Sequence, residues 1–252
     1  MATVTTATVL KRQRVNMRCD LHIHVLPKMD DGSKSVDESI QMLEVLKSQG
    51  VNNIVATPHF YLRENGVDIF LDRRQASFER LLSKYNYDGQ ICLGAEVYYA
   101  EGLYKIESFE KLAMGKSNFI LIELPYLKKI DKDILEDLED MMNYTGLTII
   151  FAHIERFYDK FTWSAKRKLL SMDAIFQINL SSFENADLSK IIFKFLKKNK
   201  FTVIGSDSHN NDTRNPECYS KGLKIIEENM GKETEEDLLR NTELIFEKIA
   251  GN

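Results

Sequence analysis

Short, continuous apolar runs alternate along the chain with longer stretches in which apolar residues recur at helical spacing. Such alternation is typical of βα units, and strands that are apolar throughout indicate a sheet covered on both faces. The sequence therefore predicts an α/β fold, either a parallel barrel or a doubly wound sheet. Seven runs are predicted to be strands: the run around Leu21, residues 54–56, "ICLGAEV" from Ile91, "NFILIEL" from Asn118, "LTIIFAH" from Leu147, "AIFQINL" from Ala174 and "FTVIGSDSH" from Phe201.

Helix boundaries are marked as well. Ser35 and Glu38 have the spacing of a capping box, apolar residues then recur as far as Leu46, and Gly50 follows as a stop signal. A further amphipathic stretch ends before Gly146, and another before Lys200. We expect a helix in each of these three places.

The composition, with 43% hydrophobic and 29% charged residues, is that of a soluble globular protein. A net charge of -4 argues against a general nucleic-acid binder. Apolar runs fall well short of the roughly 18 residues that span a bilayer, so no membrane insertion is expected. Because no linker divides the chain, one folded domain is predicted over residues 17–252.

Residues 1–16 differ from the rest, since they lack Asp and Glu and carry three basic residues. They do not contain the long apolar centre of a secretory signal. We expect either a disordered extension or a start codon placed too early, with the real start at Met17.

The three cysteines are an odd number and widely spaced, which favours reduced thiols in the cytoplasm over a disulfide framework. A cysteine-based phosphatase would need an arginine six positions after its nucleophile to hold the phosphate. The residues six positions after Cys19, Cys92 and Cys218 are Val25, Tyr98 and Lys224. The sequence therefore excludes a cysteine-based phosphatase.

All five histidines lie in a predicted strand or close to its carboxyl end, and three carboxylates lie in equivalent places. The histidines are His22, His24, His59, His153 and His209, and the carboxylates are Glu96, Glu123 and Asp207. A single histidine is more often an ordinary core or surface residue. Five at strand ends are not expected by chance, and in α/β folds the carboxyl edge of the sheet is where reactive groups gather.

Residues two apart in a strand point to the same face, so His22 and His24 present two imidazoles side by side, as a divalent metal requires. With one member of the pair Asp30 and Asp31, the candidate ligands number nine, which suits two or three ions rather than one. Mixed imidazole and carboxylate ligands suit Mn, Fe or Zn. Multinuclear sites of this kind catalyse hydrolysis of phosphate esters.

Two arginines follow the histidines closely and could bind an anionic substrate. Arg156 comes three residues after His153, and Arg214 comes five residues after His209. A guanidinium can close on two phosphate oxygens at once. The alternative for each arginine is an ordinary surface salt bridge.

The ordered motifs "DLHIHVLPKMDDGSKSVDES", "IVATPH", "GAEVYY", "FILIELP", "IIFAHIERF" and "GSDSHN" resemble the polymerase and histidinol phosphatase (PHP) superfamily. Within it, the chain is similar to the bacterial manganese-dependent tyrosine-protein phosphatases of the CpsB and YwqE type, which regulate capsular and extracellular polysaccharide synthesis. The resemblance covers almost the whole chain from Met17. It implies a distorted (β/α)7 TIM-like barrel, the PHP fold, with up to three metal ions at its carboxyl edge.

The resemblance also implies roles for individual residues. Arg156 and Arg214 would contact the phosphate, Asp31 rather than Asp30 would bind metal, and Asp207 or His209 could assist the leaving group through water. The implied metal ligands are His22, His24, Asp31, His59, Glu96, Glu123, His153, Asp207 and His209. Manganese is the expected metal, although Fe, Co and Zn accept similar ligands. The implied substrate is the phosphorylated tyrosine-rich tail of a membrane-associated tyrosine autokinase.

The chain departs from this branch in two places. Residues 1–16 have no counterpart, because the family chain starts close to the first strand. Phe60 and Tyr61 follow the "TPH" histidine, where many members have a polar or basic residue, so the rim that contacts the substrate is expected to differ. Tyr98 and Tyr99 could line the mouth of the site or pack in the barrel. Two other functions stay open: a small-molecule phosphatase such as histidinol-phosphate phosphatase, and a non-catalytic regulatory protein stabilised by its metals.

Overall fold

The computed structural model describes residues 17–198 and 200–251, so the expectations for residues 1–16 lie outside the described part of the chain. Its strands are β1 (Arg18–Ile23), β2 (Val51–Ala56), β3 (His59–Phe60), β4 (Gln90–Leu93), β5 (Glu96–Tyr98), β6 (Phe119–Glu123), β7 (Thr148–Phe151), β8 (Ile175–Asn179) and β9 (Thr202–Gly205). The α-helices are α1 (Val36–Ser48), α2 (Val67–Leu82), α3 (Lys132–Thr145), α4 (Trp163–Ser171), α5 (Ala186–Leu196), α6 (Cys218–Met230) and α7 (Lys232–Ala250). Short 3-10 helices are η1 (Leu103–Lys105), η2 (Phe109–Leu112), η3 (Ile154–Arg156), η4 (Tyr158–Lys160) and η5 (Leu180–Glu184).

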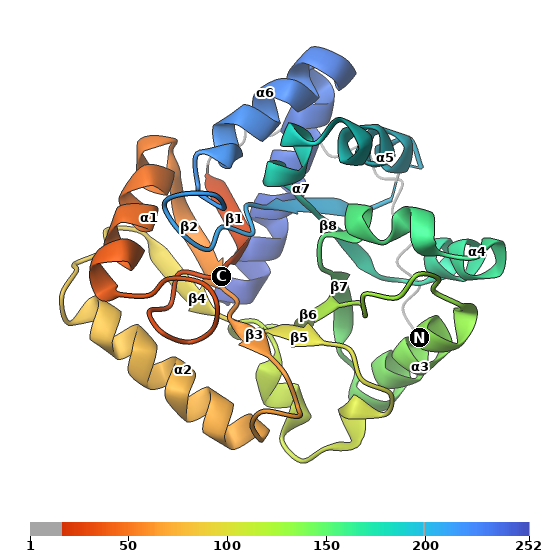
Figure 1. The fold of residues 1–252 in the computed structure, drawn as a ribbon, viewed down its shortest axis with the longest axis horizontal. Coiled ribbons are helices and arrows are strands. Elements are labelled where there is room, and N and C mark those ends of the chain that lie inside the picture. Colours follow the sequence, from red (N-terminus) through yellow and green to blue (C-terminus); the bar gives the residue numbers. More distant parts are fainter. Residues whose placement is uncertain (1–16, 199, 252) are drawn as a thin grey trace.

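The predicted α/β architecture with parallel strands is confirmed. One sheet has the order β1-β2-β4 and the other β3-β5-β6-β7-β8-β9, and every paired strand runs parallel to its neighbour. The strands lie at the centre of the molecule, and helices surround them (Figure 1). Among the described residues, no helix is both long and apolar enough to cross a membrane.

Each of the seven predicted strands is observed, but the one predicted from Ile91 is divided into β4 and β5. The reason lies next to it, where Pro58 follows β2 and has no N–H to donate to a ladder. Hydrogen bonds from the Gly94 nitrogen to the Ala56 oxygen (2.8 Å) and from the Glu96 nitrogen to the Pro58 oxygen (3.0 Å) carry the pairing past this point. β3 therefore continues β2, and β5 continues β4, beyond a shared bend.

Hydrogen bonds also join the first strand to the chain that follows the last. The His24 nitrogen donates to the Ser208 oxygen at 2.9 Å, and the Asp207 nitrogen donates to the His22 oxygen at 2.7 Å. Ile23 and Ser208 form a parallel bridge at the same place. Groups at the two ends of the sequence are thereby brought side by side.

The predicted helix boundaries are confirmed. The Ser35 hydroxyl caps α1 by accepting from the Glu38 nitrogen at 3.1 Å, and Gly50 follows the helix with φ +78°. α3 ends at Gly146, whose φ of +72° is a backbone conformation that glycine adopts without strain. α5 ends before Lys200, as predicted.

The interior has an apolar layer beneath the strand ends. Leu121, Ile150 and Val203 pack with Phe246 of α7 in one cluster of buried side chains. Because side chains two apart share a face of a strand, Glu123 lies above Leu121 on β6. The carboxyl ends of the strands therefore carry polar groups over an apolar floor.

A core substitution tests this packing. Phe151 is fully buried, and its ring stacks on Phe176 with centroids 5.7 Å apart. We predict that Phe151→Ala lowers the free energy of unfolding by about 3–5 kcal/mol, because it removes buried surface and leaves a cavity. The control Ile69→Ala, at a side chain that is 58% exposed, should cost less than about 1 kcal/mol. Urea unfolding measures both, and equal losses would contradict the assigned core.

Candidate metal centre

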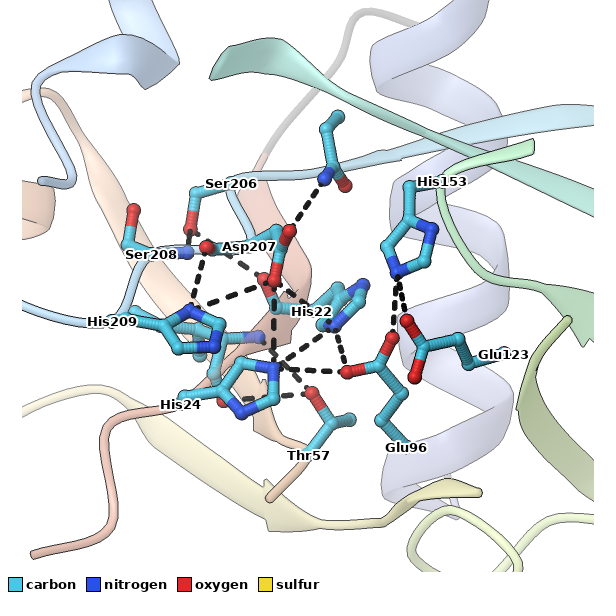
Figure 2. Close-up of polar contacts among 12 residues, drawn as sticks. His22, His24, Thr57, Glu96, Glu123, His153, Ser206, Asp207, Ser208 and His209 are labelled. Atoms are coloured by element: carbon cyan, nitrogen blue, oxygen red, sulfur yellow. Dashed lines mark hydrogen bonds and ion pairs between the residues drawn. The ribbon is translucent and has the colours of Figure 1, made fainter. Parts of the chain in front are cut away.

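The side chains singled out at the strand ends converge on one small region. Figure 2 shows this convergence for all of them except His59. The five histidines lie within contact distance of one another or of the shared carboxylates. In the sequence they are far apart, from His22 to His209. Asp31 reaches the cluster from the loop after β1, with one oxygen 3.4 Å from His209 Nε2. The structure thus brings together all nine residues predicted to bind metal.

Glu96 lies at the centre of the cluster. Its Oε2 atom is 3.1 Å from His22 Nε2, from His24 Nε2 and from His59 Nδ1, and its Oε1 atom is 2.7 Å from His153 Nε2. Both the Glu96 and the His22 side chains are fully buried. One carboxylate therefore faces four imidazoles, which lie in or just after β1, β3 and β7.

The ligand atoms fall into three overlapping groups, and within each group they lie within 4.8 Å of one another. Asp207 belongs to one group, Asp31 to another, and Glu123 to the third. The groups are His24, Asp31, His59 and His209; His22, His24, Glu96 and Asp207; and His59, Glu96 and Glu123. His153 lies outside these groups but contacts Glu123 Oε1 at 3.6 Å as well as Glu96.

The donor set fits divalent cations. Glu96 Oε2, Asp207 Oδ1 and His209 Nε2 are buried and have no hydrogen-bond partner of acceptable geometry among the described residues. A buried carboxylate oxygen without a donor is costly. The converging lone pairs belong to oxygen and nitrogen atoms, and no thiolate is among them. Such a set matches the ligand preferences of Mn, Fe or Zn.

Outer contacts orient the imidazoles. His24 Nδ1 lies 2.7 Å from Asp30 Oδ2, and His209 Nδ1 lies 2.9 Å from the Asp207 carbonyl oxygen, so each Nε2 atom faces the cluster. This is the usual arrangement for metal-binding histidines, in which the second nitrogen donates to an oxygen.

The two adjacent aspartates have different surroundings. Asp30 accepts from the His59 nitrogen at 2.8 Å and from the Gly32 nitrogen at 2.9 Å in addition to its contact with His24. Its side chain is only 7% exposed, whereas that of Asp31 is 65% exposed and faces the cluster from solvent. The geometry supports the prediction that Asp31 is the ligand and Asp30 a loop residue.

The backbone adopts unusual conformations at two of these positions. His153 has φ +29° and Asp207 has φ +53°, in the region that side chains rarely occupy. Such strain persists only where the surroundings enforce it, and it clusters at functional sites. Here it turns both side chains toward the cluster just beyond β7 and β9.

The arginines predicted to bind an anion both contact Asp207. Arg156 Nη2 lies 2.7 Å from Asp207 Oδ2, and Arg214 Nη2 lies 2.9 Å from Asp207 Oδ1. Arg214 also lies 3.7 Å from Asp31. The two guanidiniums are therefore side by side at the cluster of histidines and carboxylates and are not separate surface salt bridges.

A cavity of about 320 Å³ opens over this cluster, and both arginines line it. Its aromatic wall is formed by Tyr61, Tyr98 and Tyr126. The rings of Tyr61 and Tyr98 lie 5.5 Å apart between centroids. Tyr99 points elsewhere and donates a hydrogen bond to Asp137 at 3.0 Å, so of the two neighbouring tyrosines only Tyr98 lines the cavity.

Charge is concentrated in the cluster. Burial, reinforced by the neighbouring Glu96 carboxylate, raises the pKa of Glu123 to about 8. Burial also lowers the pKa of His24, but the Asp30 and Glu96 carboxylates outweigh it and raise the pKa to about 10. Burial raises the pKa of Asp207, yet His22 and the two arginines hold it well below its usual range. Carboxylates this close to each other favour a cation between them.

Two buried polar residues beside the cluster were not predicted. Gln177 and Asn179 of β8 are fully buried beside His22, His153 and Asp207. Their sequence signal is weak but present: they are polar, two apart, and end a strand where the neighbouring strands supply histidines or carboxylates.

Metal addition tests the centre. We predict that Mn²⁺ added to EDTA-treated protein raises the free energy of unfolding by about 2.7 kcal/mol at about 100 times its dissociation constant, because only the folded chain assembles the ligands. Thermal unfolding measures the shift, and Glu96→Gln should reduce it by more than half. No shift with Mn²⁺, Fe²⁺, Co²⁺ or Zn²⁺ would contradict a metal site.

The aspartate pair gives a second test. In metal-free protein, Asp30→Ala should lower the free energy of unfolding by about 2 kcal/mol or more, since it removes the buried partner of His24. Asp31→Ala should change it by less than about 0.5 kcal/mol because that side chain is exposed, yet it should weaken Mn²⁺ binding. Urea unfolding and calorimetry separate the two effects. The reverse ranking of stabilities would show that the pair is wrongly divided.

Known proteins similar to this chain were found by sequence. Residues 18–247 match the family model described as "Capsular polysaccharide synthesis, CpsB/CapC". The tyrosine-protein phosphatase CpsB of Streptococcus pneumoniae is 31% identical over 236 residues, which cover 87% of this chain and 93% of that protein. The tyrosine-protein phosphatase YwqE of Bacillus subtilis is 27% identical over 238 residues, which cover 90% and 91% of the two chains.

The fold is also found among solved structures. A chain from "Crystal structures of YwqE from Bacillus subtilis and CpsB from Streptococcus pneumoniae, unique metal-dependent tyrosine phosphatases" superposes with a TM-score of 0.73 at 24% identity, covering 91% of this chain and 94% of that one. At this identity the likeness establishes the fold. The family match spans nearly the whole described chain, and the chain therefore belongs to the CpsB/CapC family of capsular polysaccharide synthesis proteins.

Proposed function

We propose that this protein is a metal-dependent protein-tyrosine phosphatase that removes phosphate from the tail of a bacterial tyrosine autokinase controlling capsular or extracellular polysaccharide synthesis. The observation that carries the proposal is the pairing of Arg156 and Arg214 directly over a buried cluster of imidazoles and carboxylates. Relatives that carry the name tyrosine-protein phosphatase support the substrate class.

The proposal includes a distorted (β/α)7 barrel. Counting β2 with β3 and β4 with β5, as their shared bend suggests, leaves seven strands in the ring. The hydrogen bonds between β1 and the segment after β9 support closure of that ring. A closed barrel would place every strand end around one mouth, as the cluster requires.

Nine residues are proposed to hold up to three divalent ions: His22, His24, Asp31, His59, Glu96, Glu123, His153, Asp207 and His209. Manganese is the expected metal, and iron, cobalt or zinc would accept the same ligands. Ions bound there would supply an activated water and offset the charge on the leaving oxygen.

The arginines are proposed to bind the phosphoryl group. Arg156 and Arg214 are held side by side by Asp207, so their outer N–H groups can donate to two phosphoryl oxygens at once. Asp207 and His209 are proposed to assist the departing phenolate through water. Because phenolate is a good leaving group, such assistance is expected to contribute little.

The aromatic wall favours an aryl substrate over histidinol phosphate, the small-molecule alternative. Tyr61 and Tyr98 line the cavity beside the arginines, and Tyr126 packs on Phe157 with ring centroids 5.1 Å apart. These rings could contact a phosphotyrosine ring face to edge.

The cytoplasm is the proposed location, in agreement with three buried cysteines that form no disulfide.

Arginine substitutions test the proposal. We predict that Arg156→Ala lowers kcat on a phosphotyrosine peptide with Mn²⁺ by about 10²-fold or more, because it removes a donor to the charge that develops on the phosphoryl oxygens. Arg167→Ala is the matched control, since Arg167 lies over Trp163 on α4. It should retain parental kcat.

Substrate choice separates the alternatives. Absence of turnover with every metal would favour a non-catalytic role, and turnover of histidinol phosphate without turnover of phosphotyrosine peptide would favour the small-molecule phosphatase. Tyr61→Ala should raise KM for the phosphotyrosine peptide several-fold. It should change KM for a simple alkyl phosphate little, because that substrate has no aryl ring to contact the tyrosines. Steady-state kinetics on both substrate classes measure this difference.

A further inference from the structure

β8 differs from the other strands around the cluster, because its interior face ends in two amides, Gln177 and Asn179, and supplies neither a histidine nor a carboxylate. Both amides are fully buried, and they lie two positions apart on one face of the strand. Buried amides are retained only where their donors and acceptors are satisfied. Their partners include three of the proposed metal ligands.

The hydrogen bonds form a continuous chain. The Asn179 Nδ2 atom donates to Asp207 Oδ2 at 2.7 Å, and Gln177 Nε2 donates to Asn179 Oδ1 at 2.7 Å. Gln177 Oε1 accepts from the His153 backbone nitrogen at 2.7 Å and lies 3.1 Å from His22 Nδ1. We call the Gln177–Asn179 pair the amide relay.

Each end of the amide relay fixes its direction. The ionised Asp207 carboxylate can only accept, so the Asn179 atom next to it must be the NH₂ group. The His153 backbone N–H can only donate, so the Gln177 atom next to it must be the oxygen. The two ends require the same orientation of both amides, and neither can flip without placing oxygen against oxygen.

The orientation of the Gln177 amide determines which nitrogen of the His22 imidazole carries the hydrogen. Gln177 Oε1 can only accept, so the His22 nitrogen beside it, Nδ1, must carry the hydrogen. In the neutral ring the lone pair then lies on Nε2, which is 3.1 Å from Glu96 Oε2 in the centre of the cluster. We propose that the amide relay holds His22 in the Nδ1–H tautomer and positions Asp207, so that both present lone pairs to one divalent cation.

Space for the amide relay is preserved on the next strand. Gly205 of β9 pairs with Asn179, and a Cβ atom at Gly205 would lie 2.7 Å from His22 Cβ and 2.9 Å from Gln177 Nε2. Any larger residue would displace both partners. The glycine and the two amides therefore form one arrangement around His22.

The amides are neutral, which suits this position. Asp207, Glu96 and Glu123 already bring carboxylates to the cluster, and Arg156 also donates to Asp207 Oδ2, at 2.7 Å. Carboxylates at these two positions of β8 would add repulsion, whereas the amides supply an acceptor for His22 and a donor for Asp207 without charge. Outer contacts of this kind change metal affinity by about 10–100-fold in other sites.

The test uses metal alone and rests only on the metal-binding part of the proposed function. Gln177→Met should weaken Mn²⁺ binding at least about tenfold in calorimetry, and Asn179→Leu should also weaken it. Because the relay is interrupted at either link, the double variant should lose less affinity than the product of the two single losses. Gln49→Met, which removes an amide bonded to Pro216 and Ser220 outside the cluster, should keep parental affinity.

A spectroscopic measurement on the parent protein keeps the test valid even if a variant does not fold. With Zn²⁺ as a diamagnetic probe, the ¹⁵N spectrum of His22, assigned with His22→Gln, should show hydrogen on Nδ1 and coordination through Nε2. Coordination through Nδ1, or a Gln177→Met variant that binds Mn²⁺ as tightly as the parent, would overturn the proposal. If His22 carries hydrogen on Nδ1 but the protein does not hydrolyse phosphotyrosine, the role of the amide relay is supported and the proposed function is contradicted.

Discussion

The Glu96 carboxylate is the group on which the cluster depends, because it faces His22, His24, His59 and His153 at 2.7–3.1 Å in the buried interior. Parallel strands make such a contact possible, since their carboxyl ends meet at one edge whatever their separation in the sequence. A carboxylate with four imidazoles around it and few hydrogen bonds is costly to bury without a cation. A bound cation would offset this cost, and the same side chains are suitable ligands for it.

The rest of the structure supports that arrangement. An apolar layer with Leu121 and Val203 packs on α7 and forms a dry floor, so the polar layer is confined to the strand ends. Above the floor, Asp30 and the amide relay fix the imidazole nitrogens from outside, while Arg156 and Arg214 bring positive charge to the side that faces the cavity. The site is thus layered from the apolar floor to the orienting groups, the clustered histidines and carboxylates, and the two arginines that line the cavity.

The sequence was sufficient for the positions of the seven predicted strands and for the five histidines, Glu96, Glu123 and Asp207, because periodicity and the position of polar residues at strand ends are local signals. Asp31 was separated from Asp30 only by the family resemblance. The division of β4 from β5 was not predictable from "ICLGAEV", since its cause is Pro58, which lies between the neighbouring strands β2 and β3. Gln177 and Asn179 were missed because an amide in an apolar strand has no charge or metal preference that marks it. Tyr98 and Tyr99 could be distinguished only by the alternation of the strand, which points Tyr99 toward Asp137.

We propose above all that side chains from separate strand ends hold divalent ions at one place. Crystals grown with Mn²⁺ and measured at its absorption edge would test it directly, since anomalous peaks locate the metal independently of activity. We expect peaks within the three overlapping groups that share His24, His59 and Glu96, beneath Arg156 and Arg214. Peaks confined to surface carboxylates, or none at the strand ends, would contradict it.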